Sequence, residues 1–168
     1  VVEPVVTDIL ASLPEVTAHA ARLRVTEISL TNKSQSQFAM ETMLAAGDLL
    51  ADAQVGIMGW NGTSASWLGF DLDQRLCDAM TTRFAVPATS AVLAINELLE
   101  TLGCQRIAMV TPYVDDIQAR ILSQYGDAGY ECVAERHSGE SVNYAFAEIT
   151  SSEIERQIRE GATDGPDA

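Results

Sequence analysis

Residues 55–67 read VGIMGWNGTSASW, and this stretch decides the fold. The apolar run at residues 55–60 predicts a buried strand, and the polar residues 61–66 predict a loop. Residues 67–84 follow with apolar side chains spaced four apart, which is the spacing of one helix face. A strand, a loop and a helix in this order are typical of one unit of a parallel α/β sheet.

The same alternation continues on both sides of this unit. Further strands are expected at residues 86–89, 105–111 and 130–136, and further helices at residues 36–52, 90–102, 114–128 and 146–160. Ser36 and Ser90 are the expected N-caps, and Gly103 is the expected stop of the helix that Ser90 begins. The pattern predicts an α/β fold with a parallel sheet. An α+β domain with a few antiparallel strand pairs is the alternative.

The domain boundary is expected at residues 86–90, where a tight crossover would join two units. No Gly/Ser-rich or Pro-rich linker is visible elsewhere. We therefore predict a first α/β lobe at residues 1–87 and a second at residues 88–168.

The two halves of the sequence also resemble each other. A helix end and loop at residues 50–54 precede the strand at residues 55–60, and a similar stretch at residues 161–168 ends the sequence. If the halves are related, an equivalent strand is expected just after Ala168. Two ordinary helix-to-strand loops would give the same likeness.

Composition argues against several classes of partner. The chain has 168 residues, with 24 acidic and 10 basic side chains and a net charge of −14. Nucleic acids and anionic membrane surfaces both call for a basic footprint. No apolar run approaches the roughly 18 residues that span a bilayer, and no secretory leader is visible. Three cysteines without a disulfide pattern make a reducing cytoplasm the expected location. A small anion can still bind where backbone N–H groups converge. A homo-oligomer is left open.

The cysteines and histidines indicate neither a disulfide framework nor a metal site. Cys77, Cys104 and Cys132 lack CxxC spacing, and none is expected at the carboxyl end of a strand. Each is interpreted as a packing residue rather than a reactive thiolate. His19 and His137 are far apart in sequence. His137 ends a predicted strand and is interpreted either as polar lining or as a surface residue.

The loop after the first strand of this stretch has the chemistry of an anion site. Ligands of parallel sheets bind beyond the carboxyl ends of the strands. Gly62, Thr63 and Ser64 offer backbone N–H groups and two hydroxyls there, at a predicted helix N-terminus. The loop matches neither GxGxxG nor a Walker A motif. A carboxylate or phosphate would fit it, and simple capping of the helix is the alternative. Trp60 and Trp67 flank the loop as core candidates.

Two later loops carry further candidates. Residues 110–116, VTPYVDD, place Tyr113 at the mouth of a strand, where its phenol can donate a hydrogen bond to an anion. The alternative is that the ring packs on a neighbouring helix. Asp115 and Asp116 are interpreted as partners of a helix dipole. Asn143 can hydrogen-bond a substrate or can simply belong to a turn.

Together these residues resemble the Asp/Glu racemase superfamily, in the branch of arylmalonate decarboxylase and maleate cis-trans isomerase. The resemblance rests on GTSAS at residues 62–66, on VTPYVDD at residues 110–116 and on Asn143. It covers most of the chain. It implies two pseudo-symmetric lobes with parallel, flavodoxin-like sheets, an active site between them, and no metal or organic cofactor. It also implies a chain truncated at both ends, with an expected asparagine before Val1.

The resemblance implies a role for each candidate. Thr63 and Ser64 would bind a substrate carboxylate through their hydroxyls and N–H groups. Tyr113 would hydrogen-bond that carboxylate or an enolate-like oxygen, and Asn143 would assist. Gly62 stands where racemases and isomerases have a first cysteine, whereas decarboxylases of the branch have glycine there and keep only a second cysteine. That second cysteine is expected just beyond residue 168, so the chain as printed would lack its proton-transfer residue.

The implied function is a cofactor-independent lyase or isomerase. It would act on a small (di)carboxylic acid through an enediolate-type intermediate, as arylmalonate decarboxylase does. A maleate cis-trans isomerase or an amino-acid or hydantoin racemase is the alternative among enzymes. A non-catalytic carboxylate-binding module is the alternative outside them.

Overall fold

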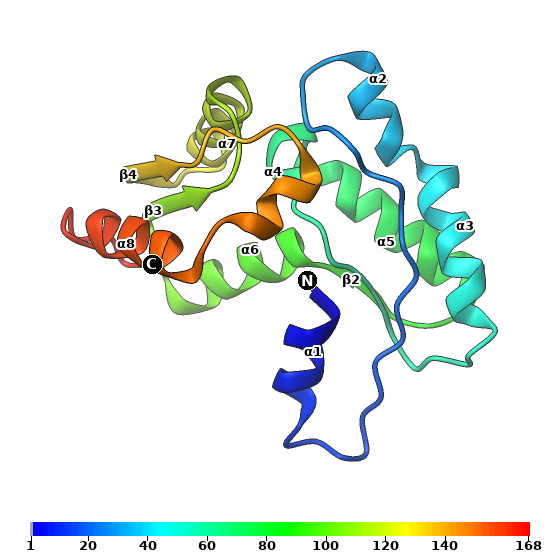
Figure 1. Ribbon diagram of the computed structural model, residues 1–168. Helices are drawn as coiled ribbons and strands as arrows, with labels where there is room; N and C mark the ends of the chain where they lie inside the picture. The colour runs from blue at the N-terminus through cyan, green and yellow to red at the C-terminus, as the bar shows by residue number, and fades with distance from the viewer. Residues whose placement is uncertain (1) are drawn as a thin grey trace.

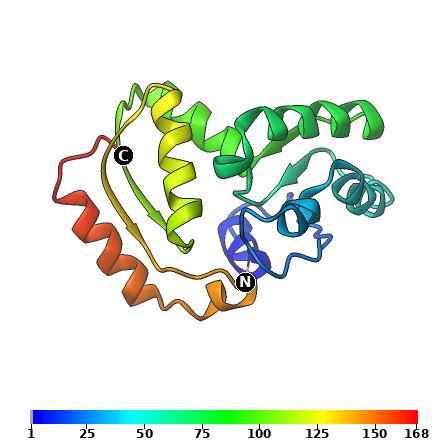
Figure 2. The same cartoon turned by 90° about the horizontal axis from the view of Figure 1, so that it is seen from above.

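The computed structural model describes residues 2–168 (Figure 1). In chain order its elements are α1 (Val2–Leu10), α2 (Asn32–Gln35), η1 (Ser36–Phe38), α3 (Met40–Ala51), β1 (Met58–Trp60), α4 (Ala65–Leu68), α5 (Phe70–Phe84), β2 (Ala88–Ser90), α6 (Ala91–Leu102), β3 (Arg106–Thr111), α7 (Asp115–Asp127), β4 (Glu131–His137), η2 (Asn143–Glu148) and α8 (Ser151–Ala162). Figure 2 shows β3, β4, α7 and α8 grouped on one side of the molecule and α3 and α5 on the other.

The four strands form two sheets, each of two parallel strands. β1 pairs with β2, with Trp60 opposite Ser90, and β3 pairs with β4, with Thr111 opposite His137. The predicted α/β fold with parallel strands is therefore confirmed. Within residues 2–168, antiparallel pairing occurs at one isolated bridge, between Glu27 and Val142. The predicted boundary between residues 87 and 88 falls just before β2, which pairs with β1, and the division into two lobes stays a prediction.

Local caps explain where several helices begin and end. The side chain of Ser90 accepts a hydrogen bond of 3.1 Å from the Leu93 N–H, so the predicted N-cap of α6 is confirmed. Gly103 follows α6 with φ +69, a left-handed conformation that glycine adopts without strain. Thr150 caps α8 as Ser90 caps α6, because it accepts a hydrogen bond of 3.2 Å from the Glu153 N–H.

Two predicted helices start later than expected. The helix expected at residues 146–160 is preceded by the 3-10 helix η2, and α8 begins only after its cap. The helix expected at residues 36–52 begins with Ala39, not Ser36, at its N-cap position. The hydroxyl of Ser36 instead donates a hydrogen bond of 2.8 Å back to the Lys33 carbonyl. That local bond gives the serine side chain a different partner from the one a helix cap requires.

The helix expected at residues 67–84 is two helices, α4 and α5, separated by one glycine. Gly69 has φ +127 and ψ 131, a backbone conformation that L side chains rarely adopt. After this break α5 runs beside β2 and α3, whereas α4 packs on α7. Gly69 therefore permits the orientation of α4 and of the loop before it.

The core consists of two clusters of buried side chains. One contains Ile28, Trp67, Leu99, Ile107, Tyr113, Ile117, Ile121 and Tyr125. The other contains Leu44, Met58, Leu76 and Met80. Trp67 is the largest of the fully buried side chains and is 1% exposed, so its interpretation as a core residue is confirmed. Its burial in the first cluster draws α4 toward β3 and α7.

The last residues of the chain lie along β3, on the edge away from β4. The Asp167 N–H donates to the Arg106 carbonyl at 2.6 Å, and the Ala108 N–H donates to the Ala168 carbonyl at 2.9 Å. The Asp167 carboxylate also accepts hydrogen bonds from the N–H groups of Arg106 and Gln105, which lower its pKa.

None of the helices in residues 2–168 combines the length and the apolar character needed to cross a bilayer.

We predict that Gly69→Ala lowers the free energy of unfolding by about 1–3 kcal/mol, because alanine is strained in that backbone conformation. Its Cβ would also lie 2.7 Å from an oxygen of Asp71. Gly126→Ala is the matched control: it lies inside α7 with nothing within 4 Å of the added Cβ, and it should stabilise the protein by up to about 1 kcal/mol. Urea unfolding measures both changes. Equal effects of the two substitutions would contradict the proposed strain.

Candidate functional site

The candidate site begins where β1 ends. After Trp60, the loop at residues 61–64 leads into α4. The Thr63 carbonyl accepts a hydrogen bond of 3.1 Å from the Ser66 N–H, and the Ser64 carbonyl accepts one of 2.9 Å from the Leu68 N–H. The Ser64 hydroxyl does not cap α4, so helix capping does not account for that side chain. Because α4 has only 4 residues, its dipole is small, and local hydroxyl and N–H groups are the donors of this loop.

Thr63 and Tyr113 meet at this loop although they are 50 positions apart in the chain. Their hydroxyl oxygens lie 2.6 Å apart and share one hydrogen bond. Tyr113 is 7% exposed, and burial raises the pKa of its phenol, which keeps the hydroxyl protonated at neutral pH. Two hydroxyls carry two protons, and the contact between them uses one. The second proton remains available for an anion.

Backbone hydrogen bonds fix Tyr113 at the end of β3. The Ser138 N–H donates to the Thr111 carbonyl at 3.1 Å, and the Gly139 N–H donates to the Tyr113 carbonyl at 3.0 Å. The Tyr113 ring packs edge-on against Phe146, with ring centroids 5.6 Å apart. The ring is therefore packed, as the alternative interpretation expects, and the hydroxyl contacts Thr63. Donation by Tyr113 to an anion stays a prediction.

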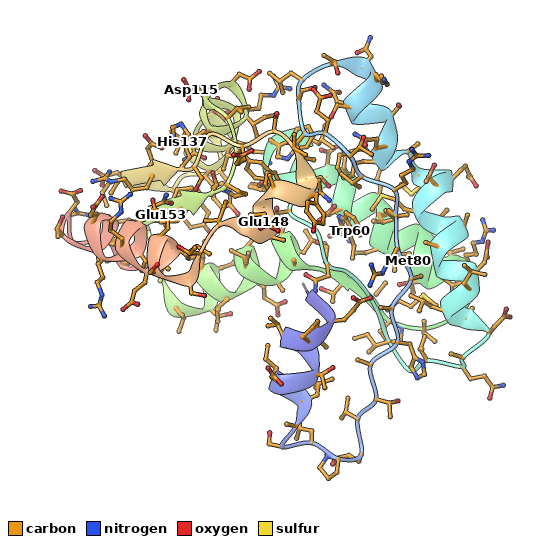
Figure 3. The ribbon with its side chains drawn as sticks, viewed as in Figure 1. Trp60, Met80, Asp115, His137, Glu148 and Glu153 are labelled. Carbon is orange, nitrogen blue, oxygen red and sulfur yellow. The ribbon has the colours of Figure 1, made fainter. Side chains whose placement is uncertain are left out.

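Two indole N–H groups beside the loop have no partner. The side-chain nitrogens of Trp60 and Trp67 are buried and make no hydrogen bond in the part of the chain that the structure describes. The Trp67 indole still lies close enough to the Tyr113 hydroxyl to lower its pKa somewhat, against the larger effect of burial. Figure 3 shows Trp60 in the central part of the molecule. A buried N–H without a partner costs about 1–3 kcal/mol, so both groups are candidate donors to a bound acceptor.

The Trp60 ring covers the Cα atom of Gly62. A Cβ atom added to Gly62 would lie 2.3 Å from the nearest ring atom of Trp60, which is too close for a real contact. Gly62 is not among the glycines with positive φ, so the ring, and not the backbone, is what excludes a side chain here. Position 62 is the one expected to distinguish isomerases from decarboxylases. The space that a side chain would need there is thus filled by the Trp60 ring.

Asn143 makes its contacts elsewhere. It is exposed at the start of η2. Its side-chain amide donates to the Val25 carbonyl at 3.2 Å, and its N–H donates to the Thr26 carbonyl at 3.0 Å. Among the hydrogen bonds of residues 2–168, none joins Asn143 to Thr63 or Tyr113. Its role as a site residue stays a prediction.

The three cysteines are free thiols. Cys77 is buried in α5, and burial raises the pKa of its thiol to about 11. Burial also raises the pKa of Cys132 in β4. A raised pKa keeps a thiol protonated and weakly nucleophilic, in keeping with a packing role. In the described chain, no group of three or more His, Cys, Asp or Glu side chains could hold a metal ion.

Sequence reasoning missed a chain of polar side chains behind Tyr113. Gln118 is 2% exposed, accepts a hydrogen bond of 2.6 Å from the Thr111 hydroxyl and donates one of 3.1 Å to Glu135. Glu135 also contacts His137 at 2.9 Å. A weak signal was present, because Glu135 and His137 are two residues apart on a strand and therefore share one face.

Two loops at the carboxyl ends of parallel strands, one from each sheet, thus bring neutral hydroxyl and N–H donors to one place. This is an α/β protein with the features of a carboxylate site. The chain belongs to the arylmalonate decarboxylase family, whose model matches residues 2–168. None of the curated proteins compared with the chain matches it.

Solved structures share this fold. A crystal structure of arylmalonate decarboxylase aligns with a TM-score of 0.65 and 22% identity over 77% of this chain and 57% of that one. A mutant of arylmalonate decarboxylase in a liganded form gives 0.79 and 19% over 93% of this chain and 66% of that one. A Nocardia farcinica maleate cis-trans isomerase mutant with a covalently bound succinylcysteine intermediate gives 0.78 and 20% over 95% and 67%. The resemblance to this superfamily branch is confirmed, and the chain spans 57% of the length of the first of these proteins.

We predict measurable coupling between the two site hydroxyls. Thr63→Val and Tyr113→Phe each remove one partner of the 2.6 Å contact. The double variant should therefore lose about 0.5–1.5 kcal/mol less stability than the two single losses combined. Chemical unfolding of the four proteins measures the difference. A second cycle with Tyr144→Phe, whose residue is 77% exposed, is the control. Equal coupling in both cycles would contradict the contact.

We also predict that Gly62→Ala destabilises the protein by about 1–3 kcal/mol, because the Trp60 ring has to move to accommodate the methyl group. In a Trp60→Ala background the same substitution should be close to neutral. Melting temperatures of the four proteins test this. If the alanine costs as much without the ring as with it, the ring is not the obstacle.

Proposed function

We propose that the protein is a cofactor-independent lyase or isomerase that acts on a small (di)carboxylic acid through an enediolate-type intermediate. Decarboxylation of an arylmalonate-type acid is the leading reaction. We include a cytoplasmic location in this proposal. The net charge of −14 favours a small acid held by local donors over a polyanionic partner.

The observation that carries the proposal is the contact between Thr63 and Tyr113. Two hydroxyls from separate loops lie 2.6 Å apart, with one proton to spare, beside the buried Trp67 indole. The Ser64 hydroxyl, not used as a cap, belongs to the same loop. Such a set of fixed neutral donors is suited to an oxyanion. Membership of the arylmalonate decarboxylase family supports this kind of reaction.

In the proposed reaction the bond between Cα and one carboxylate of a malonate-type dianion breaks. CO2 leaves, and the bonding electron pair passes into the remaining carboxylate, which becomes an enediolate. Negative charge grows on its oxygens, where Thr63, Ser64 and Tyr113 donate hydrogen bonds. Donors positioned in advance stabilise this charge most in the transition state. A proton, drawn ultimately from water, then adds to Cα and yields the monocarboxylate anion. Cys77 and Cys132, with raised pKa values, are unsuited to deliver it.

Two other functions use the same donors. In a maleate cis-trans isomerase or an amino-acid or hydantoin racemase, the same loops would hold the substrate carboxylate. The fold shared with maleate isomerases supports this candidate, whereas the Trp60 ring over Gly62 disfavours a thiol at position 62. A non-catalytic carboxylate-binding module would retain the hydrogen bonds and lack the proton transfer.

The test is CO2 release from phenylmalonate by the full-length protein and by its variants made in the full-length protein. Thr63→Val and Tyr113→Phe should each lower kcat by about 10²–10³, the usual cost of one lost oxyanion donor. Tyr144→Phe removes a phenol that is 77% exposed and should leave the rate unchanged.

The other outcomes separate the candidates. Conversion of maleate or of a chiral amino acid without CO2 release would favour the isomerase or racemase. Binding of phenylmalonate without turnover would favour the binding module. Neither binding nor turnover of any of these acids would contradict the proposed site.

A further inference from the structure

A run of five polar side chains connects the start of α7 with the backbone of Tyr113. From the inside outward its members are Thr111, Gln118, Glu135, His137 and Asp115. Successive polar atoms lie 2.6, 3.1, 2.9 and 2.8 Å apart. At the inner end the Tyr113 N–H donates to the Thr111 hydroxyl oxygen at 3.4 Å. Figure 3 shows His137 and Asp115 together at the outer end.

The partners of the imidazole define the protonation state of His137. Nδ1 faces an oxygen of Glu135, and Nε2 faces an oxygen of Asp115. Ionised carboxylates only accept hydrogen bonds, so both ring nitrogens have to donate. Only the imidazolium form has two N–H groups. In agreement with this geometry, the two hydrogen-bonded carboxylates raise the pKa of His137.

The directions of the inner hydrogen bonds follow in the same way. Glu135 accepts from the Gln118 amide nitrogen, and the Gln118 carbonyl oxygen accepts from the Thr111 hydroxyl. The Thr111 oxygen is then left to accept from the Tyr113 N–H. Because Gln118 is 2% exposed, water does not readily replace either of its partners. A change in charge or position at Glu135 is therefore transmitted through Gln118 to Thr111, the last residue of β3.

The geometry points to His137 as a positioning residue, whose protonated ring holds the turn around Tyr113 and thereby keeps the Tyr113 hydroxyl against Thr63. His137 ties the end of β4 to Asp115, which lies two residues after Tyr113 and begins α7. The segment just after His137, residues 138–140, hydrogen-bonds the backbone of residues 111–113. We call the hydrogen bonds of His137 to Glu135 and Asp115 the clamp. The effect of the clamp on ligand binding rests on the proposed function, whereas the clamp itself does not.

Two further charged groups on the elements packed against β4 bond to other partners. On α7, an oxygen of Asp116 accepts a hydrogen bond from the Ile117 N–H at 2.7 Å. On α8, Glu160 pairs with Arg136 of β4 at 3.3 Å. On β3, the residue in register with His137 is the uncharged Thr111. Asp115 and Glu135 are therefore the two carboxylates bonded to the imidazole.

The sign of the pH dependence follows from the raised pKa of His137. Stabilisation by the clamp is complete below about pH 6.5, the pKa of an unperturbed histidine, and is lost as the pH rises through the higher pKa of the folded protein. Above that pKa the neutral ring can donate to only one carboxylate.

NMR titration of the histidine ring signals tests the clamp, and His19→Gln assigns the two histidines. His137 should titrate above about pH 6.5. Glu135→Gln should lower its pKa, because the ring loses one of its two carboxylate partners. Asp115→Asn should also lower it, because Asp115 provides the other hydrogen bond to the ring. Asp116→Asn is the matched control and should leave it unchanged. A His137 pKa at or below the ordinary value would overturn the inference.

The backbone amide signals of Thr63 and Tyr113 test the positioning role. In the unmodified protein they should shift with the same midpoint as the His137 ring, and in His137→Gln this inflection should disappear. His137→Arg keeps the charge and several donors, so it should hold both signals constant over that range. Amide signals that do not shift as His137 is protonated would overturn its role as a positioning residue.

Phenylmalonate affinity over the same pH range separates this inference from the proposed function. Affinity should fall several-fold as His137 loses its proton, and it should stay level in His137→Arg. Absence of binding at every pH, with the amide coupling intact, would contradict the proposed function and leave the clamp established. Binding that does not change with pH would overturn the effect of the clamp on the ligand.

Discussion

Packing of α4 on α7 is the interaction on which the rest of the site depends. Trp67 of α4 is 1% exposed in the cluster that also contains Tyr113, and the Gln124 amide of α7 donates a hydrogen bond of 2.6 Å to the Ala65 carbonyl. A buried tryptophan removes about 150–250 Å² from water, and the directed amide bond then selects one placement of α4. Thr63 lies just before α4 and Tyr113 just before α7, so this packing is what brings their hydroxyls together.

The resulting donors are neutral, and that has a chemical consequence. Hydroxyl and indole groups are desolvated at little cost compared with ammonium or guanidinium groups, so they can be held ready in a buried place. Their hydrogen bonds strengthen as charge develops on an acceptor oxygen, and in the proposed reaction this would favour the enediolate over its parent acid. The raised pKa of Tyr113 works in the same direction, because it keeps the phenol a donor at neutral pH. The Trp60 ring covers Gly62 in the same loop.

Features that depend on neighbours in the sequence could be predicted, whereas features that depend on contacts between distant residues could not. The alternation of strands and helices and the Ser90 cap depend on neighbours in sequence, so they could be read directly. Thr63 and Tyr113 were recognised one at a time, but their contact depends on tertiary packing across 50 positions. The break at Gly69 was hidden because apolar spacing continues across it and only a backbone angle reveals it. The role of Gln118 depends on partners from two strands, which no helical pattern specifies.

The central claim is that Thr63 and Tyr113 together bind one carboxylate of the substrate. A crystal structure of the protein with bound phenylmalonate, or with a non-reactive analogue of it, tests this most directly. One carboxylate should have an oxygen about 2.5–3.0 Å from both hydroxyl oxygens, the normal O–H···O range. A ligand bound elsewhere, with the two hydroxyls still bonded only to each other, would contradict it.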